Sequence, residues 1–303
     1  MNQLSFVISG NQLSCWRKKA KQQAIAAHIP PSDVDWLIKA TTNLDSLSLH
    51  LNHFQDQEAI LGRFSLSSLE ELWSARLSQR VPLQYLVGEV YWRDFRLKVT
   101  PAVLIPRPET ELIIDIAFDA AKQQAQKDLT QGHWVDLGTG SGAIACGLAS
   151  LFSSAQIHAV DCSEEALTLA RINARDLELT EKISFYQGSW WEPLSALKGK
   201  ISGMVSNPPY IPTDEVAQLQ PEVTRHEPHL ALDGGNDGLE SIRHLISSSV
   251  DYLHPGGIWL VEIMAGQAAT VKTLLEASEH YVNIEVLSDL AGIERFILAC
   301  RIE

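Results

Sequence analysis

The chain has 303 residues, with 37 acidic and 24 basic side chains and a formal charge of −13. A non-specific nucleic-acid binder needs clustered Lys and Arg to neutralise phosphates, and the longest basic run here is residues 17–19. The composition, 45% hydrophobic and 20% charged, excludes a disordered or fibrous chain. Because the length exceeds what one hydrophobic core usually covers, we expect a second, smaller domain.

Neither a membrane segment nor a metal site is indicated by the sequence. There is no run of about 18 apolar residues, and residues 1–10 lack a basic start followed by an apolar stretch. We therefore expect a cytoplasmic protein with no membrane partner. The four cysteines and ten histidines show no ligand or disulfide spacing, so we expect reduced thiols and no metal.

The first hundred residues change from a helical to a strand-like pattern. Residues 14–27 and 66–80 place apolar side chains at three- and four-residue spacing, and no alternating pattern occurs before about residue 84. Residues 84–99 then alternate bulky β-formers with polar residues, which predicts a hairpin. We expect a helical domain over residues 1–82, a hairpin linker over 83–104 and the main domain over 105–303.

The main domain has a repeating strand and helix pattern. Pro108 fixes an entry φ for a helix predicted over residues 109–127, and Ser163 followed by two glutamates is a favourable helix start. Seven strands with interposed helices predict a doubly wound, Rossmann-like α/β domain. The strands are predicted at residues 134–137, 156–160, 183–186, 201–206, 257–263, 282–287 and 295–300, and further helices at about 143–151, 163–177, 238–253 and 267–277.

A glycine-rich turn, GTGSG at residues 138–142, lies between the first of these strands and the next helix. Glycines let the backbone turn tightly and let a ligand approach main-chain N–H groups at the helix start. Asp161 ends the next predicted strand roughly 20 residues further on, where a carboxylate can accept both ribose hydroxyls of a nucleoside-containing cofactor. The sequence therefore predicts a nucleoside-binding edge.

Two cofactor classes compete for this edge. A dinucleotide fold needs GxGxxG so that pyrophosphate fits over the helix start, whereas this turn reads GTGSG and follows Asp136. A carboxylate at Asp136 would repel pyrophosphate but suits the positively charged amino-acid end of S-adenosylmethionine. We therefore expect S-adenosylmethionine as the ligand.

A second motif, Asn207-Pro208-Pro209-Tyr210, follows the strand predicted at residues 201–206. The two prolines stiffen the loop, so the Asn207 side chain and the Pro208 carbonyl point in fixed directions. Each can accept a hydrogen bond from a planar –NH₂ group, and Tyr210 offers a ring face to a flat substrate. Two such acceptors would orient a weakly nucleophilic nitrogen for attack on a methyl group.

Together these segments resemble one methyltransferase family. The sequences LIPRPETE at 104–111, VDLGTGSGAIA at 135–145, VSNPPYI at 205–211, HEPHLALDGGNDGL at 226–239 and DLAGIERF at 289–296 are similar to bacterial glutamine methyltransferases that modify class I peptide chain release factors. The resemblance covers nearly all of residues 84–303 and is weak before residue 80, where it implies only a helical substrate-recognition domain over residues 1–82. It implies methylation of the side-chain amide nitrogen of the glutamine in the Gly-Gly-Gln motif of a release factor.

The resemblance also implies roles for individual residues. Asn207 and the Pro208 backbone would hold the target amide, Tyr210 would pack against it, and Asp161 would bind the donor ribose. The segment after residue 106 discriminates against sister enzymes that act on a ribosomal protein. The implied donor-binding residues are Asp136, Gly138, Thr139, Gly140, Gly142, Asp161, Ser189, Trp190, Trp191 and Asn207, and the implied substrate-binding residues are Arg107, Glu109, Thr110, Asn207, Pro208, Pro209 and Tyr210.

The chain departs from the family pattern in two places. Ser189 stands where an acidic residue usually accepts from the adenine amine, and a hydroxyl can still accept that bond. Trp190 and Trp191 are candidates to cover the adenine, with a core position as the alternative for one of them. Met264 stands where a glycine is common, which concerns the local loop geometry. Glu227 and Asp233 are expected to organise their loop, with contact to the substrate as the alternative.

Two alternative functions remain open at this stage. A DNA adenine methyltransferase would use the same Asn-Pro-Pro-Tyr motif, but it needs a basic face and a target-recognition segment. A donor-binding regulatory or scaffold protein would not need the second acceptor site at Asn207. The charge and the intact motif favour an enzyme, and we expect a monomer whose partner is a release factor and not nucleic acid.

Overall fold

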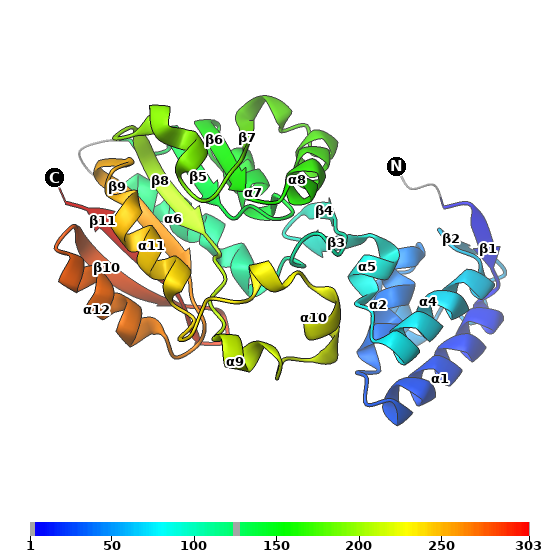
Figure 1. Cartoon of the computed structure of the whole chain (residues 1–303). Helices are drawn as coiled ribbons and strands as arrows, with labels where there is room; N and C mark the ends of the chain where they lie inside the picture. The colour runs from blue at the N-terminus through cyan, green and yellow to red at the C-terminus, as the bar shows by residue number, and fades with distance from the viewer. Residues whose placement is uncertain (1–3, 124–127, 303) are drawn as a thin grey trace. The chain divides into compact units, whose positions relative to one another are not determined.

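The computed structural model describes residues 4–123 and 128–302 (Figure 1). The chain separates into two compact units. One contains the residues up to Gly88 together with Pro221–His226, and the other contains Glu89–Gln220 and the residues from 227 onward. The recognition role and the boundaries that the sequence suggested for residues 1–82, 83–104 and 105–303 stay proposals.

The first unit is a set of helices around its own apolar core. Leu13, Trp16 and Ala20 on one helix pack with Leu37 on the next and Trp73 on a later one, all of them buried. The helical spacing noted in the sequence accounts for this core. The elements are β1 (Phe6–Ile8), α1 (Gly10–Ala26), α2 (Ser32–Thr41), α3 (Ser46–Leu51), β2 (Ile60–Gly62), α4 (Leu66–Gln79), α5 (Leu83–Val87) and α10 (Pro221–His226).

Two sequence-based expectations for the first unit were wrong. β1 and β2 pair antiparallel, although no strand was expected before residue 84. Each has three residues, which is too short to show a period of two. Residues 84–87 belong to the helix α5, and the hairpin begins only at β3 (Glu89–Trp92) and continues in β4 (Phe95–Lys98). Gly88, at a φ of 79°, ends α5 and explains the change.

Ion pairs join α10 to the helices of the same unit. Arg76 on α4 donates to Glu222 on α10 at 2.6 Å and to Asp33 on α2 at 2.8 Å. Arg80 lies 3.2 Å from Glu222 as well, and His226 contacts the Gln79 carbonyl at 2.9 Å. Residues 221–226 therefore fold with the N-terminal helices.

The second unit is built on the α/β sheet that the sequence predicted. Among the described residues, seven strands form one mixed sheet, in which β9, β8, β5, β6 and β7 run parallel and β11 runs antiparallel to both of its neighbours. The spatial order is β10 (Tyr281–Ser288), β11 (Glu294–Arg301), β9 (Leu253–Glu262), β8 (Ile201–Ser206), β5 (Gln131–Leu137), β6 (Ser154–Asp161) and β7 (Ile183–Gln187).

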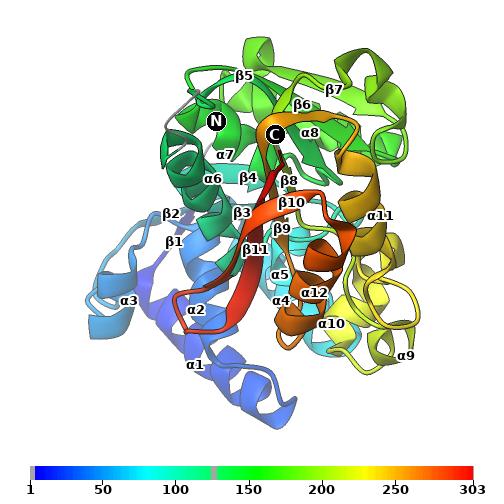
Figure 2. The ribbon, with the colours of Figure 1, turned by 90° about the vertical axis from the view of Figure 1, so that its left-hand side faces the viewer.

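Helices cover both faces of this sheet. Figure 2 shows α6 and α7 on one side of the strands and α11 and α12 on the other. Alternate strand residues such as Val135, Met204 and Val261 point toward α11 and α12 and are fully buried. The helices are α6 (Leu112–Gln123), α7 (Ala143–Leu151), α8 (Glu164–Asp176), α9 (Thr213–Val216), α11 (Glu240–Ser249) and α12 (Ala268–Ser278).

The predicted helix ends are confirmed in part. Ser163 caps α8, since its side chain accepts from the Ala166 N–H at 3.2 Å. The helix predicted over 109–127 begins with a 3₁₀ turn at Glu109–Glu111 and continues as α6, and its predicted end at residues 124–127 lies outside the described part of the chain. The helix predicted to reach residue 253 ends at Ser249, because β9 already begins at Leu253.

Gly203 in β8 provides a test of the sheet packing. A Cβ added at Gly203 would lie 2.3 Å from the ring of Trp134 on β5, which is completely buried. We expect Gly203→Ala to lower the free energy of unfolding by about 1–3 kcal/mol through overpacking, as measured by urea unfolding. In a Trp134→Leu background the cost should be smaller, because the obstructing ring is absent. An equal cost in both backgrounds would contradict this explanation.

Candidate active site

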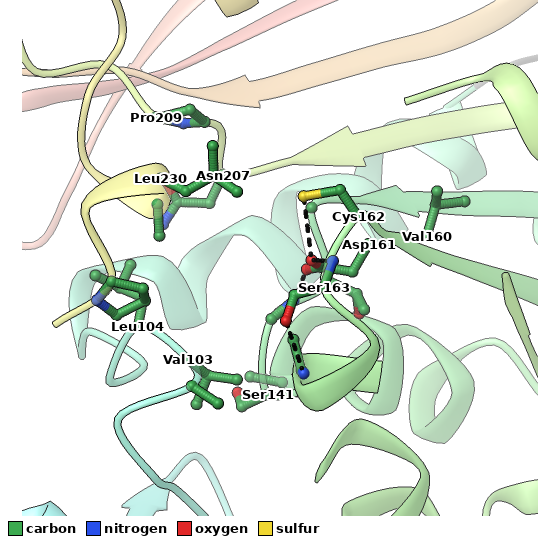
Figure 3. Close-up of a pocket in the computed structure, with 18 of the residues that line it drawn as sticks. Val103, Leu104, Ser141, Val160, Asp161, Cys162, Ser163, Asn207, Pro209 and Leu230 are labelled. Atoms are coloured by element: carbon green, nitrogen blue, oxygen red, sulfur yellow. Dashed lines mark hydrogen bonds between the residues drawn. The ribbon is translucent and has the colours of Figure 1, made fainter. Parts of the chain in front are cut away.

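The parallel strands end at a cavity of about 520 Å³ in the second unit. Figure 3 shows Asp161 and Ser163 on one side of this cavity and Asn207, Pro209 and Leu230 on another. Further walls come from residues 101–104 and from the glycine-rich turn. The cavity therefore brings the two predicted motifs together at the carboxyl edge of the sheet.

The glycine-rich turn adopts backbone angles that would be strained in residues with a Cβ. Gly138, Gly140 and Gly142 have φ values of 78°, 53° and 81°. The N–H groups of Gly138 and Thr139 both donate to the Val160 carbonyl at 2.9 Å, which ties the turn to β6. At Gly142 a Cβ would lie 3.0 Å from a side chain of α8, so this glycine permits close helix packing and does not line the cavity.

Asp136, at the end of β5, lies beneath the turn. It is completely buried, and its Oδ2 accepts from Thr139 Oγ1 at 2.6 Å and from the Ala145 N–H at 3.0 Å. Its Oδ1 has no hydrogen-bond partner among the described residues. Burial raises the pKa of this carboxyl to about 7, against the lowering effect of the two hydrogen bonds. Asp136 supports the cavity from below and is not part of its lining.

Asp161 lines the cavity directly. It ends β6, as expected, and its Oδ2 accepts from the Gly140 N–H at 2.8 Å. Its Oδ1 accepts from the Ser163 N–H at 2.9 Å at the start of α8. Each carboxylate oxygen can accept a further hydrogen bond, so Asp161 both fixes the turn and presents acceptors to a ligand.

The two tryptophans after β7 have different surroundings. Ser189 and Trp190 line the cavity. Trp191 instead belongs to the apolar core, where its ring stacks on Tyr252 at a centroid distance of 4.4 Å. The backbone N–H of Ser189 donates to Glu192 Oε2 at 3.1 Å. The Glu192 carboxylate therefore lies beside Ser189, the residue that stands where the family usually has an acidic side chain.

The Asn-Pro-Pro-Tyr loop follows β8 as predicted. Asn207 and Pro209 line the cavity, whereas Pro208 and Tyr210 are outside its lining. Asn207 Nδ2 donates to Thr110 Oγ1 at 3.3 Å. Tyr210 Oη donates to Glu262 Oε1 at 3.1 Å, and burial together with the Glu262 charge raises the pKa of Tyr210.

The cavity wall formed by residues 101–110 contains an ion pair between Arg107 and Glu227. Arg107 and Thr110 line the cavity, and Glu109 does not. Arg107 Nη2 lies 2.9 and 2.7 Å from the two carboxylate oxygens of Glu227, a buried residue whose pKa is raised by burial and held back by Arg107. Asp233 accepts from Thr213 Oγ1 at 2.7 Å. These contacts agree with the expectation that Glu227 organises its loop, whereas Asp233 also lines the cavity, where a substrate contact is open to it.

Glu262 and the apolar lining of the cavity were not predicted from the sequence. Glu262 ends β9 and is completely buried; its Oε1 accepts from Tyr210 Oη, and its Oε2 has no hydrogen-bond partner among the described residues. A carboxylate at the end of a buried parallel strand was the available signal, since Asp136 and Asp161 share that position. Leu104 and Leu230 give the cavity an apolar wall, for which the sequence offered no periodic pattern.

The described residues contain neither a metal-binding cluster nor a membrane-spanning helix. Within residues 4–123 and 128–302 there is no group of three or more His, Cys, Asp or Glu side chains that could hold a metal ion. None of the helices in these ranges is long and apolar enough to cross a lipid bilayer.

Comparisons with known sequences point to methyltransferases. A family model for the methyltransferase small domain matches residues 113–236. The chain is 52% identical over 96% of its length to a release factor glutamine methyltransferase of Synechocystis, of which the match covers 97%. It is 48% identical to that of Thermosynechococcus vestitus, over 86% of this chain and 88% of the relative, and 42% identical to that of Moorella thermoacetica, over 76% and 80%.

Comparisons with solved structures show the same fold at low identity. The catalytic domain of hMettl16, solved in complex with the MAT2A 3'UTR hairpin 6, aligns with a TM-score of 0.56 and 13% identity over 88% of this chain and 89% of that one. A human methyltransferase 10 domain containing protein aligns with a TM-score of 0.50 and 17% identity, over 69% and 90%. Both likenesses concern the fold of the sheet and its helices.

The raised pKa of Asp136 predicts an effect on stability. The folded chain keeps this proton from about pH 4 to about pH 7, where the unfolded chain has lost it, so the group lowers stability as pH rises through this window. In Asp136→Asn, which cannot ionise, the free energy of unfolding relative to wild type should increase with pH across the window and level off above it. Urea unfolding without ligand measures this difference, and a difference independent of pH would contradict the assignment.

Proposed function

Because this chain belongs to the family of release factor glutamine methyltransferases, we propose that it methylates the side-chain amide nitrogen of the glutamine in the Gly-Gly-Gln motif of class I peptide chain release factors. Enzymes of this family depend on S-adenosylmethionine as methyl donor. The observation that carries the proposal is the single cavity in which Asn207 and Pro209 lie across from Asp161.

The residues at the turn fit this donor. Asp136 has a buried carboxylate oxygen without a partner in the described chain, which suits a positively charged ligand above the turn. Gly138, Thr139 and Gly140 would hold the methionine end, and Asp161 would accept from the ribose hydroxyls. When bound, the donor supplies an electrophilic methyl group on a sulfonium.

At the adenine end of the donor, fewer residues would contact the ligand than the sequence suggested. Ser189 and Trp190 are the candidates to contact the base, since both line the cavity. Trp191 supports them from the core through its stacking on Tyr252. Gly142 contributes through the close packing of the turn against α8.

The substrate side of the cavity would orient the target amide. Asn207 Oδ1 and the Pro208 carbonyl would each accept one hydrogen of the amide –NH₂, which points the nitrogen at the methyl group and favours the positive charge that it develops. Pro209 stiffens the loop, and Tyr210, fixed by Glu262, would flank the amide. We propose no general base, because an alkylated amide nitrogen loses its extra proton readily.

The wall made by residues 101–110 would contact the chain around the glutamine. Arg107, held by Glu227, and Thr110 line the cavity, and Glu109 belongs to the adjoining 3₁₀ turn. We propose that the chain acts as a monomer on release factors in the cytoplasm, without a metal. The formal charge of −13 argues against nucleic acid as the substrate.

The test is transfer of labelled methyl from S-adenosylmethionine to a purified, unmodified bacterial release factor. A copy whose Gly-Gly-Gln glutamine is changed and duplex DNA serve as parallel substrates. Label on the intact release factor alone is the expected result. Label on DNA alone would support the adenine methyltransferase alternative instead, and donor binding without any transfer would contradict the proposed substrate.

Asn207→Ala separates substrate orientation from donor binding. Because only an amide-orienting contact is lost, turnover should fall about 100-fold or more, while the donor dissociation constant changes less than about threefold. Steady-state kinetics and isothermal titration calorimetry measure the two quantities. Turnover close to that of the wild type would remove Asn207 from this role.

Asp161→Asn should weaken donor binding and leave turnover almost unchanged, which is the opposite of the effect expected for Asn207→Ala. An amide has one acceptor oxygen, so it can accept from only one of the N–H groups of Gly140 and Ser163 and cannot accept from both ribose hydroxyls. We expect the donor to bind about 10-fold more weakly or worse, with little change in turnover at saturating donor. An unchanged donor dissociation constant would argue against the ribose contact.

A further inference from the structure

Leu230 is an exposed leucine at the edge of the proposed substrate site. Its relative exposure is 69%, yet it lines the cavity, on the same side as Asn207 and Pro209 (Figure 3). Of the large hydrophobic side chains that are exposed within residues 4–123 and 128–302, Leu230 is the one that belongs to the cavity lining. Single exposed leucines are common on protein surfaces, so its place at the cavity is the feature that requires an explanation.

Contacts at both ends hold the loop that carries Leu230. On one side of it, the Glu227 carboxylate accepts from Arg107 Nη2 at 2.7 Å. On the other side, the Leu232 carbonyl accepts from the N–H of Ile211 at 3.0 Å. Ile211 directly follows the Asn-Pro-Pro-Tyr motif, so the loop is attached to the segment that carries the proposed amide acceptors. Leu230 is therefore presented to solvent in a defined position relative to that motif.

The polar groups of the substrate site are less exposed than Leu230. Asn207 is partly buried, and its Nδ2 donates to Oγ1 of Thr110, which is only 4% exposed. This bond leaves Asn207 Oδ1 available to a ligand. An amide that reaches Oδ1 from solvent must carry its aliphatic part past the mouth of the cavity, where Leu230 and Leu104 are apolar.

We propose that Leu230 is a specificity-determining residue that contacts the side-chain methylene groups of the target glutamine. This inference rests on the proposed function, in which Asn207 Oδ1 accepts from the target amide. Glutamine has two methylene groups between its Cα and its amide, and asparagine has one. With the substrate main chain outside Leu230, an asparagine amide would stop about 1.5 Å short of the acceptors, the length of one carbon–carbon bond.

The size of the effect follows from the loss of one apolar contact. One methylene group in an apolar pocket changes kcat/KM about 10- to 200-fold. Because Leu230 is largely exposed and the mouth is open, the lower limit applies here. The contact is made both in the bound substrate and in the transition state, so its loss raises KM and leaves kcat nearly unchanged.

Leu230→Asn tests the contact, because it keeps the approximate size of the side chain and removes its apolar surface. With a release factor as the varied substrate and donor at saturation, KM should rise about 10-fold and kcat should change less than about threefold. The donor dissociation constant, measured by calorimetry, should stay at the wild-type value. Urea unfolding should show wild-type stability, since Leu230 is exposed.

A release factor copy with asparagine in place of the target glutamine completes the test as a competitive inhibitor. Its shorter side chain does not make the full contact with Leu230. Its inhibition constant should therefore differ less than about threefold between the wild type and Leu230→Asn, whereas the KM of the glutamine substrate differs about 10-fold. An equal loss for the two release factors would overturn the proposal.

Val282→Asn is the matched control. Val282 is 42% exposed and lies outside the cavity lining. It belongs to β10, the outer strand of the sheet, whereas Asn207 follows β8, and β11 and β9 lie between these two strands. The same polar change at this position should leave KM, kcat and the donor dissociation constant at their wild-type values.

The remaining outcomes separate this inference from the proposed function. A wild-type KM in Leu230→Asn, with methylation by the wild type intact, would contradict the inference alone. A weaker donor dissociation constant in Leu230→Asn would assign Leu230 to the donor and would also overturn it. Failure of the wild type to methylate any release factor would contradict the proposed function, and this inference with it.

Discussion

The site depends on two carboxylates that hold the glycine-rich turn between β5 and α7. Asp136 binds the turn and the start of α7 from below, through Thr139 and the Ala145 N–H, and Asp161 binds it from the side through the Gly140 N–H. Because the glycines adopt φ values that other residues avoid, the turn needs these contacts to keep one conformation. Asp161, together with Asp136 once it is ionised, gives this end of the cavity a negative potential that suits a cationic donor.

On the substrate side of the cavity, side chains of neighbouring elements also hold the Asn-Pro-Pro-Tyr loop. Asn207 and Tyr210 follow the end of β8. Tyr210 donates to Glu262 at the end of β9, and Asn207 donates to Thr110. The sheet thus holds the proposed donor-binding and substrate-binding residues on neighbouring strand ends.

Much of this arrangement could be predicted from local sequence, and the rest required the fold. The strand that ends at Asp161 and the loop that begins at Asn207 have clear hydrophobic and turn patterns. Trp191 could not be separated from Trp190 in this way, because stacking on Tyr252 is a contact between residues distant in sequence. Glu262 was missed for the same reason, since its partner Tyr210 comes from another part of the chain. The short pair β1 and β2 has too few residues to show a period.

The most direct test of the central claim is a crystal structure of the chain with S-adenosylhomocysteine and a peptide that contains Gly-Gly-Gln. We expect the glutamine side-chain nitrogen to lie within hydrogen-bond distance of Asn207 Oδ1 and of the Pro208 carbonyl, with the nucleoside ribose on Asp161. A glutamine amide held by other groups, or an Asn207 side chain that presents its –NH₂ group to the peptide, would contradict the claim that this loop orients the substrate.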